Sequence, residues 1–249
     1  MSHHAKYVNA LENYNSAIND VTQRIMQDRT LHAHNMNELY IQALAGGEHP
    51  DYVSMVEQAV AERSVYNDRK MLLDAADLTV HESKLNQALR HNRGALSGGG
   101  VRDASPTALR GLNYAAKRSN ALHASFNQKL AHDRAVHEQE LEALYSASPS
   151  NTACKSALAR MIKMRHANNR ARTVHDANMW ASTDAKVYSE LGGGAEAMEV
   201  IHHGVEGAQT PQMRGGGGDI TMPLENPEAA KLWGDIIGQS RDISGGAFY

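Results

Sequence analysis

The chain has 249 residues, of which 41% are hydrophobic and 5% aromatic, and its formal net charge is −3 at pH 7. This balance excludes a globally basic nucleic-acid binder, although not a local basic patch. The single cysteine, Cys154, excludes an internal disulfide framework and a cysteine-based zinc site. The N-terminus has no apolar secretory stretch, and no run approaches the ~18 apolar residues of a transmembrane helix. We therefore expect a chain made in soluble form in a reducing compartment.

The first segment, residues 5–45, carries a heptad seam, which is a helix surface suited to another helix. Its apolar positions alternate at spacings of four and three, at Tyr7, Leu11, Tyr14, Ile18, Val21 and Ile25. At ~1.5 Å per residue this helix would be about 60 Å long, so it needs long partner helices. Beyond Ile25 the seam turns polar, at Asp28, His32 and Asn35.

Three further long helices follow from proline and glycine signals. A second helix is predicted from Pro50 to Arg93, with a capping box at Ser54–Glu57 as an alternative start. Ser105-Pro106 predicts a third helix as far as residue 146, and Ser148-Pro149 predicts a fourth as far as residue 191. The third helix has polar residues at in-register positions, including Ser119, His123, Asp133 and His137.

These signals predict an all-α fold of four antiparallel helices of about 40 residues each. Residues 1–194 would form an elongated bundle or two helical hairpins, and residues 195–249 a flexible Gly-rich tail with short helices. Short helices are expected at 195–203 and from Asn226-Pro227 to Ile237. The tail offers small apolar anchors for a neighbouring subunit, with packing on its own bundle as the equal alternative: Leu232, Trp233, Ile236, Ile237, Phe248 and Tyr249.

Fourteen histidines raise the question of a metal site. Glu199 and His202 form one Glu-x-x-His, but a di-metal helical bundle needs two such motifs and further glutamates. Three Asp/His pairs are four residues apart and read as surface hydrogen bonds or weak ion pairs: Asp28/His32, Asp77/His81 and Asp133/His137. No metal and no cofactor is predicted. A bundle whose stability falls as histidines gain charge near pH 6.5 is a separate hypothesis.

The polar seam positions have two explanations. They could fix helix register inside a bundle, or the seam could face a water-filled lumen or be only partly buried in a multimer. The low mean hydropathy of −0.52 favours the second explanation.

Nucleophilic catalysis has no support in the sequence. Cys154 lies beside Lys155, which could lower its pKa, but no partner motif accompanies it. We expect a buried structural thiol. The glycine tracts lack the features of a phosphate-binding loop. Neither an enzyme nor a small-molecule substrate is predicted.

The fourth predicted helix contains a basic segment with no acidic residue inside it. Its members form a candidate binding face: Lys155, Arg160, Lys163, Arg165, Arg170 and Arg172. Such a segment can bind DNA, anionic lipid or an acidic partner. The other interpretation is a solvated face balanced by acidic residues elsewhere in the chain.

The chain combines long helices rich in Ala, Asn, Gln and Arg with polyglycine breaks and a Gly-rich tail. Residues 7–17 and 163–172 are examples of these helical segments. In this the chain resembles the internal virion proteins, or ejection proteins, of short-tailed bacteriophages. The resemblance implies a homo-oligomer packaged in the capsid with portal, tail or core proteins as partners. It also implies release through the tail and assembly into a helical tube for genome delivery across the host envelope. The absence of a strongly apolar helix favours a periplasmic tunnel, a core or a tail-associated part.

Two alternatives accompany this expectation. One is a fixed virion component, such as an adaptor, a connector or a tail-associated ring protein. The other is a helical binding module that contacts DNA or anionic lipid through the basic segment. The expected location is the virion, made in the host cytoplasm, with the host periplasm or envelope after ejection.

Overall fold

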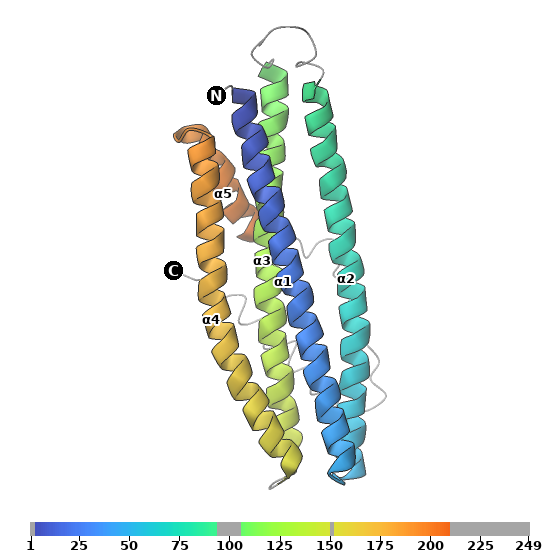
Figure 1. The fold of residues 1–249 in the computed structure, drawn as a ribbon. Coiled ribbons are helices and arrows are strands. Elements are labelled where there is room, and N and C mark those ends of the chain that lie inside the picture. The colour runs from blue at the N-terminus through green and yellow to red at the C-terminus, as the bar shows by residue number, and fades with distance from the viewer. Residues whose placement is uncertain (1–2, 94–105, 150–151, 210–249) are drawn as a thin grey trace. The chain divides into compact units, whose positions relative to one another are not determined.

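A computed structural model describes residues 3–93, 106–149 and 152–209, and helices with short turns make up this part of the chain (Figure 1). The helices are α1 (His3–Ala45), α2 (Pro50–Arg93), α3 (Pro106–Ala147), α4 (Ala153–Glu190) and α5 (Ala195–Gln209). Within the described residues there is no strand, and four of the helices are about 40 residues long and pack against each other. The predicted all-α class is confirmed. None of these helices combines the length and the apolar content needed to cross a bilayer.

The turn between α1 and α2 follows local chemistry. Gly47 adopts φ 63°, a left-handed conformation that glycine accepts without strain. The carbonyl of His49 accepts hydrogen bonds from the amides of Tyr52 at 2.9 Å and Val53 at 3.1 Å. Helical bonding therefore begins at Pro50, as predicted, and the alternative start at Ser54 is wrong.

The start of α4 differs from the prediction. The Ser148 hydroxyl donates to the Tyr145 carbonyl at 2.8 Å, so Ser148 closes the end of α3 instead of opening α4. Thr152 is the true cap, because its Oγ1 accepts the Lys155 amide at 3.1 Å. The predicted start at Ser148-Pro149 is therefore wrong.

The Thr152→Ala variant should unfold with a free energy about 1 kcal/mol lower than the parent, because one amide of the first turn of α4 loses its acceptor. Urea unfolding followed by circular dichroism measures this change. Ser156→Ala is the control, since Ser156 is exposed and lies inside α4. A loss in the control as large as in Thr152→Ala would contradict the capping role.

Each long helix contributes to two compact units. The first unit contains residues 3–24, 70–93, 106–129 and 174–209 of the described chain. The second unit contains residues 25–69, 130–149 and 152–173. Each unit has an apolar core of its own.

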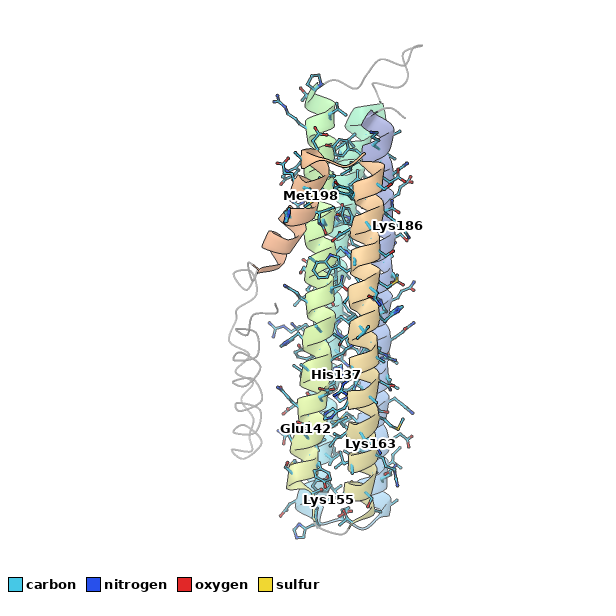
Figure 2. The ribbon with its side chains drawn as sticks, turned by 90° about the vertical axis from the view of Figure 1, so that its left-hand side faces the viewer. His137, Glu142, Lys155, Lys163, Lys186 and Met198 are labelled. Carbon is cyan, nitrogen blue, oxygen red and sulfur yellow. The ribbon has the colours of Figure 1, made fainter. Side chains whose placement is uncertain are left out.

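The first unit has an apolar core to which α5 belongs. Ala197 and Val200 of α5 are fully buried in it. The Asn120 amide of α3 donates to the carbonyls of Val200 at 3.1 Å and Ile201 at 3.0 Å. Figure 2 labels Met198 on this helix. The first residues of α5 thus pack on the first unit, which for this part of the predicted tail is the alternative of packing on its own bundle. The predicted docking residues from Leu232 to Tyr249 lie outside the described residues.

The second unit combines two helical hairpins, α1 with α2 and α3 with α4. Near the turns its core is apolar and includes Met36, Leu39, Tyr52, Val56, Leu141, Leu144, Cys154 and Leu158. Farther along the same helices the buried side chains are charged, and this charged region is the candidate site.

Candidate functional site

A group of charged and histidine side chains occupies the interior of the second unit. We call it the charged cluster: Asp28, Arg29, His32, Arg63, Asp133, His137, Glu140 and Arg165. Each member is at most 4% exposed, and the members come from α1, α2, α3 and α4. Figure 2 labels His137 on α3. Ordinary cores leave such residues outside, so the cluster needs internal partners.

Three ion pairs join different helices across the charged cluster. Arg29 Nε lies 2.6 Å from Asp133 Oδ2, joining α1 to α3. Arg165 Nη1 lies 2.7 Å from Asp28 Oδ1, joining α4 to α1. Arg63 of α2 pairs with Glu140 of α3. Each buried carboxylate therefore has an arginine partner on another helix.

The two histidines of the cluster stack on each other, with ring centroids 4.0 Å apart. His137 Nδ1 lies 2.9 Å from Asp28 Oδ2, and His32 Nε2 lies 2.7 Å from Glu140 Oε2. Because a carboxylate only accepts, the proton of each ring is assigned to the nitrogen that faces it. Arg165 Nη2 also lies 3.1 Å from His137 Nδ1, and with this assignment that contact is not a hydrogen bond, because both atoms carry protons. Burial lowers the pKa of both histidines well below 6.5, and the charges of Arg63 and Arg165 add to this effect. Both rings are therefore neutral at pH 7.

Several buried nitrogen atoms of the cluster have no hydrogen-bond partner within the described part of the chain. They include Nδ1 of His32, Nε2 of His137, Nε of Arg165, and Nε and Nη1 of Arg63. A buried polar group without a partner costs about 1–3 kcal/mol. The cluster therefore specifies which helices meet, while it contributes less stability than an apolar core of the same volume.

The predicted pairings along single helices are wrong. Asp28 and His32 do not pair with each other but with α3, and Asp133 pairs with Arg29 of α1. Asp77 binds Lys129 at 2.8 Å, while His81 is only 6% exposed. The lumen explanation is also wrong for the seam residues of the cluster, since they are buried among side chains of their own unit. Their interhelical pairing supports the register explanation.

The basic segment of α4 does not form one face. Arg165 is 4% exposed, and Arg172 reaches the same Asp28 carboxylate at 3.3 Å. Lys155 Nζ donates to the Ser148 carbonyl at 3.2 Å and lies over the Tyr145 ring. The side chains that remain exposed are Arg160, Lys163 and Arg170. The six-residue face is thus corrected to three exposed cations; Figure 2 labels Lys155 and Lys163.

Heptad spacing places the buried arginines of α1, α2 and α4 on the core sides of their helices. Arg165 and Arg172 lie seven and fourteen residues after the buried Leu158, and thus on its side of α4. Arg63 lies seven residues after the buried Val56, and Arg29 seven before the buried Met36. The spacing alone did not predict burial of these arginines, because arginine is a charged residue that is mostly found at the surface.

Cys154 is a structural thiol. It is 1% exposed, and its Sγ lies 3.8 Å from the Tyr52 hydroxyl. Burial raises the pKa of the Cys154 thiol, so the expected buried thiol is confirmed, and the lowering that Lys155 could have caused is not found.

The first unit contains a smaller polar group around Tyr14. The Tyr14 hydroxyl donates to Asp184 Oδ1 at 3.4 Å, and burial raises the pKa of Asp184 to about 6. The His123 ring lies between Tyr14 and Trp180, with centroid distances of 6.4 and 6.0 Å. Burial lowers the pKa of His123 to about 4. At neutral pH the ionised Asp184 is therefore a destabilising group in this unit.

Asp184→Asn should raise the free energy of unfolding by about 2 kcal/mol at pH 7.5. The amide accepts the Tyr14 bond without a charge. Because the folded pKa is raised, the stability due to the protonated Asp184 is full below about 3.8 and lost as pH rises through about 6. The gain should therefore shrink markedly at pH 4.5 in urea unfolding.

Asp20→Asn serves as the control for this change, since the Asp20 side chain is 47% exposed in the same unit. Its effect should stay below about 0.5 kcal/mol at both pH values. A pH-independent effect of Asp184→Asn would contradict the assigned pKa.

The chemistry open to these groups is narrow. The charged cluster contains no serine, threonine, cysteine or lysine, and its carboxylates are paired with arginines in the interior. No three His, Cys, Asp or Glu side chains of the described segments are grouped so that they could hold a metal ion. What the cluster can do is hold helices in register and resist protonation as pH falls, so that acid favours the unfolded chain. No family model, no curated protein and no solved structure matches the chain.

Proposed function

We propose that the protein is a structural component of a bacteriophage virion, an internal or ejection protein that assembles into a multimeric helical tube or core for genome delivery. In this proposal it is not an enzyme and binds no small-molecule substrate. The observation that carries the proposal is the distribution of side chains in the second unit, which has charges inside and large apolar residues outside.

The outside of the second unit carries a surplus of large apolar side chains. Exposed fractions of 51–65% are found at Met26, Ile41, Leu44, Val65 and Met164. Single exposed apolar residues are common, but here they accompany a core that contains eight charged or histidine residues. Packing between copies would cover the exposed side chains and supply stability that the core lacks.

The charged cluster also suits delivery through a narrow channel. Buried ion pairs roughly balance their Coulomb attraction against lost hydration, so opening the helices costs little. The hydrogen bonds within the long helices are local contacts, and proteins rich in local contacts refold quickly. A chain of this kind can lose its tertiary packing, pass the tail and regain its fold in the multimer.

The test is absolute mass by light scattering over a concentration series. A discrete ring-sized multimer is the expected result, and a monomer at every concentration would overturn the assembly proposal. An antibody should detect the protein in DNA-filled particles and lose it in particles that have ejected their DNA. Retention in emptied particles would favour a fixed adaptor, connector or tail-associated ring protein instead.

A further inference from the structure

The two units hold different kinds of titratable group in their interiors. The second unit buries the stacked rings of His32 and His137 completely. The first unit holds a carboxyl and a histidine together, in a group that we call the Tyr14 group: Tyr14, His123, Trp180 and Asp184. Burial disfavours the charged form of both, so acid destabilises a buried histidine and stabilises a buried carboxyl. The two interiors should therefore respond differently to acid.

The ring pair of the second unit has no acceptor left for a further proton. One nitrogen of His32 faces Glu140 at 2.7 Å, and one nitrogen of His137 faces Asp28 at 2.9 Å. The other nitrogens, Nδ1 of His32 and Nε2 of His137, are buried and have no hydrogen-bond partner in the described chain. The folded unit therefore resists the protons that the unfolded chain takes up near pH 6.5.

Charged groups face the ring pair from all four long helices. The three carboxylates among them are each paired with an arginine of another helix, so none can stabilise a protonated ring without weakening such a pair. The groups are Asp28 and Arg29 of α1, Arg63 of α2, His132, Asp133 and Glu140 of α3, and Arg165 and Arg172 of α4.

The Tyr14 group compensates its own histidine. Asp184 accepts hydrogen bonds from the side chains of Tyr14 and Trp180, and burial raises its pKa to about 6, while burial lowers the pKa of His123 to about 4. The stability due to the protonated Asp184 grows as pH falls through about 6, and the stability due to the neutral His123 is lost below about 6.5. Between pH 7 and pH 5 these two effects largely cancel.

The remaining charged groups of the first unit do not change this balance. Those that act on His123 are Asp20 and Arg24, and Arg24 is paired with both Asp20 and Asp176. His81 is a second buried histidine and adds a loss in acid, but it is one uncompensated ring against two in the second unit. The other groups are Glu82 of α2 and Arg118 of α3, which act on His81, and Glu196 and Glu199 of α5, which act on Tyr7.

We propose that acid opens the second unit while the first unit stays closed. The stacked histidines of the charged cluster are the trigger, and Asp184 is the group that protects the first unit. Acidification thus imposes an order of opening on one chain and brings the buried arginines of the cluster into water. This device is independent of the proposed virion function.

Hydrogen exchange with mass spectrometry on the full chain at pH 7 and pH 5 tests the order, with protection expressed relative to the intrinsic exchange rate at each pH. Protection over residues 25–69, 130–149 and 152–173 should fall about 600-fold, the effect of two rings with an unfolded pKa of about 6.5. Over residues 3–24, 70–93, 106–129 and 174–209 the fall should be at least about tenfold smaller. Equal losses in the two units, or a larger loss in the first, would overturn the proposal.

Asp184→Asn removes the protecting carboxyl. The acid-induced loss of protection in the first unit should then grow by about tenfold, while the loss in the second unit stays as in the parent. Asp20→Asn is the matched control, because the Asp20 side chain is 47% exposed, and it should leave both losses unchanged. An Asp184→Asn variant with the parent's first-unit loss would contradict the protecting role. In His32→Gln, His137→Gln an undiminished second-unit loss would contradict the trigger.

Discussion

Asp28→Ala should lower the free energy of unfolding of the second unit by about 3–5 kcal/mol. Asp28 accepts from Arg165 at 2.7 Å, from His137 at 2.9 Å and from Arg172 at 3.3 Å. Its removal leaves the Arg165 guanidinium buried without a counter-charge. Hydrogen exchange with mass spectrometry, read over residues 25–69, 130–149 and 152–173, should show the loss as faster exchange throughout this unit.

Glu142→Ala is the matched control, because Glu142 is a carboxylate on α3 of the same unit but is exposed (Figure 2). Its pairing with His166, at 3.1 Å, joins two half-exposed side chains. Such a pair is worth little in water, so the expected change is below about 0.5 kcal/mol. Equal effects of the two variants would show that Asp28 is not the centre of the charged cluster.

Replacing the connected group as a whole should be far less harmful than removing Asp28 alone. The triple variant Asp28→Leu, His137→Leu, Arg165→Met replaces the carboxylate and two of its buried partners with apolar side chains of comparable size. Arg172 can turn to water because its side chain is 41% exposed. Recovery of most of the lost stability would separate the burial of an unpaired charge from a simple loss of packing volume.

Acid should destabilise the second unit through His32 and His137. Their folded pKa values lie well below 6.5, so the unfolded chain binds more protons as pH falls. Their stabilisation is complete above about 6.5 and is lost toward the lower folded values. For two rings this is about 2.7 kcal/mol between pH 7.5 and pH 5.5. The unfolding midpoint in urea should therefore be clearly lower at pH 5.5.

The neighbours of these rings explain why protonation is resisted. Basic side chains face them from every helix of the unit: Arg29 on α1, Arg63 on α2, His132 on α3 and Arg165 on α4. The carboxylates of Asp28 and Glu140 already accept hydrogen bonds from the neutral rings, while Asp133 is engaged by Arg29. A proton on either histidine would therefore add charge to an interior that already holds the arginines.

The double variant His32→Gln, His137→Gln tests the source of this pH dependence. Glutamine can still donate to the two carboxylates but does not titrate. The loss of stability between pH 7.5 and pH 5.5 should become about 2.7 kcal/mol smaller than in the parent. An unchanged pH dependence would assign the effect to other groups, such as His123 in the first unit.

The sequence by itself determined the number, type and limits of the long helices. Heptad spacing from Tyr7 to Ile25, proline at residues 50 and 106, and glycine after Ala45 are local signals. They act through backbone geometry and through hydrogen bonds within a few residues. The one misplaced start, at Ser148-Pro149, arose where two local signals competed and Thr152 provided the cap.

Only the tertiary structure decided which polar seam residues are paired and with what. The spacing of Asp28 and His32 allows a bond along α1, yet both side chains point to α3 because α1 packs there in a definite register. From the sequence alone Arg165 is assigned to the surface because it is basic. In the structure it is buried, because it pairs with Asp28, 137 positions away in the chain. Similarly, the sequence shows α5 only as a short helical segment after a glycine turn. Its place in the first unit depends on Asn120 of α3, which donates to two of its carbonyls. Pairing energies of this kind depend on neighbours that are distant in the chain, and a single sequence does not state which helices become neighbours.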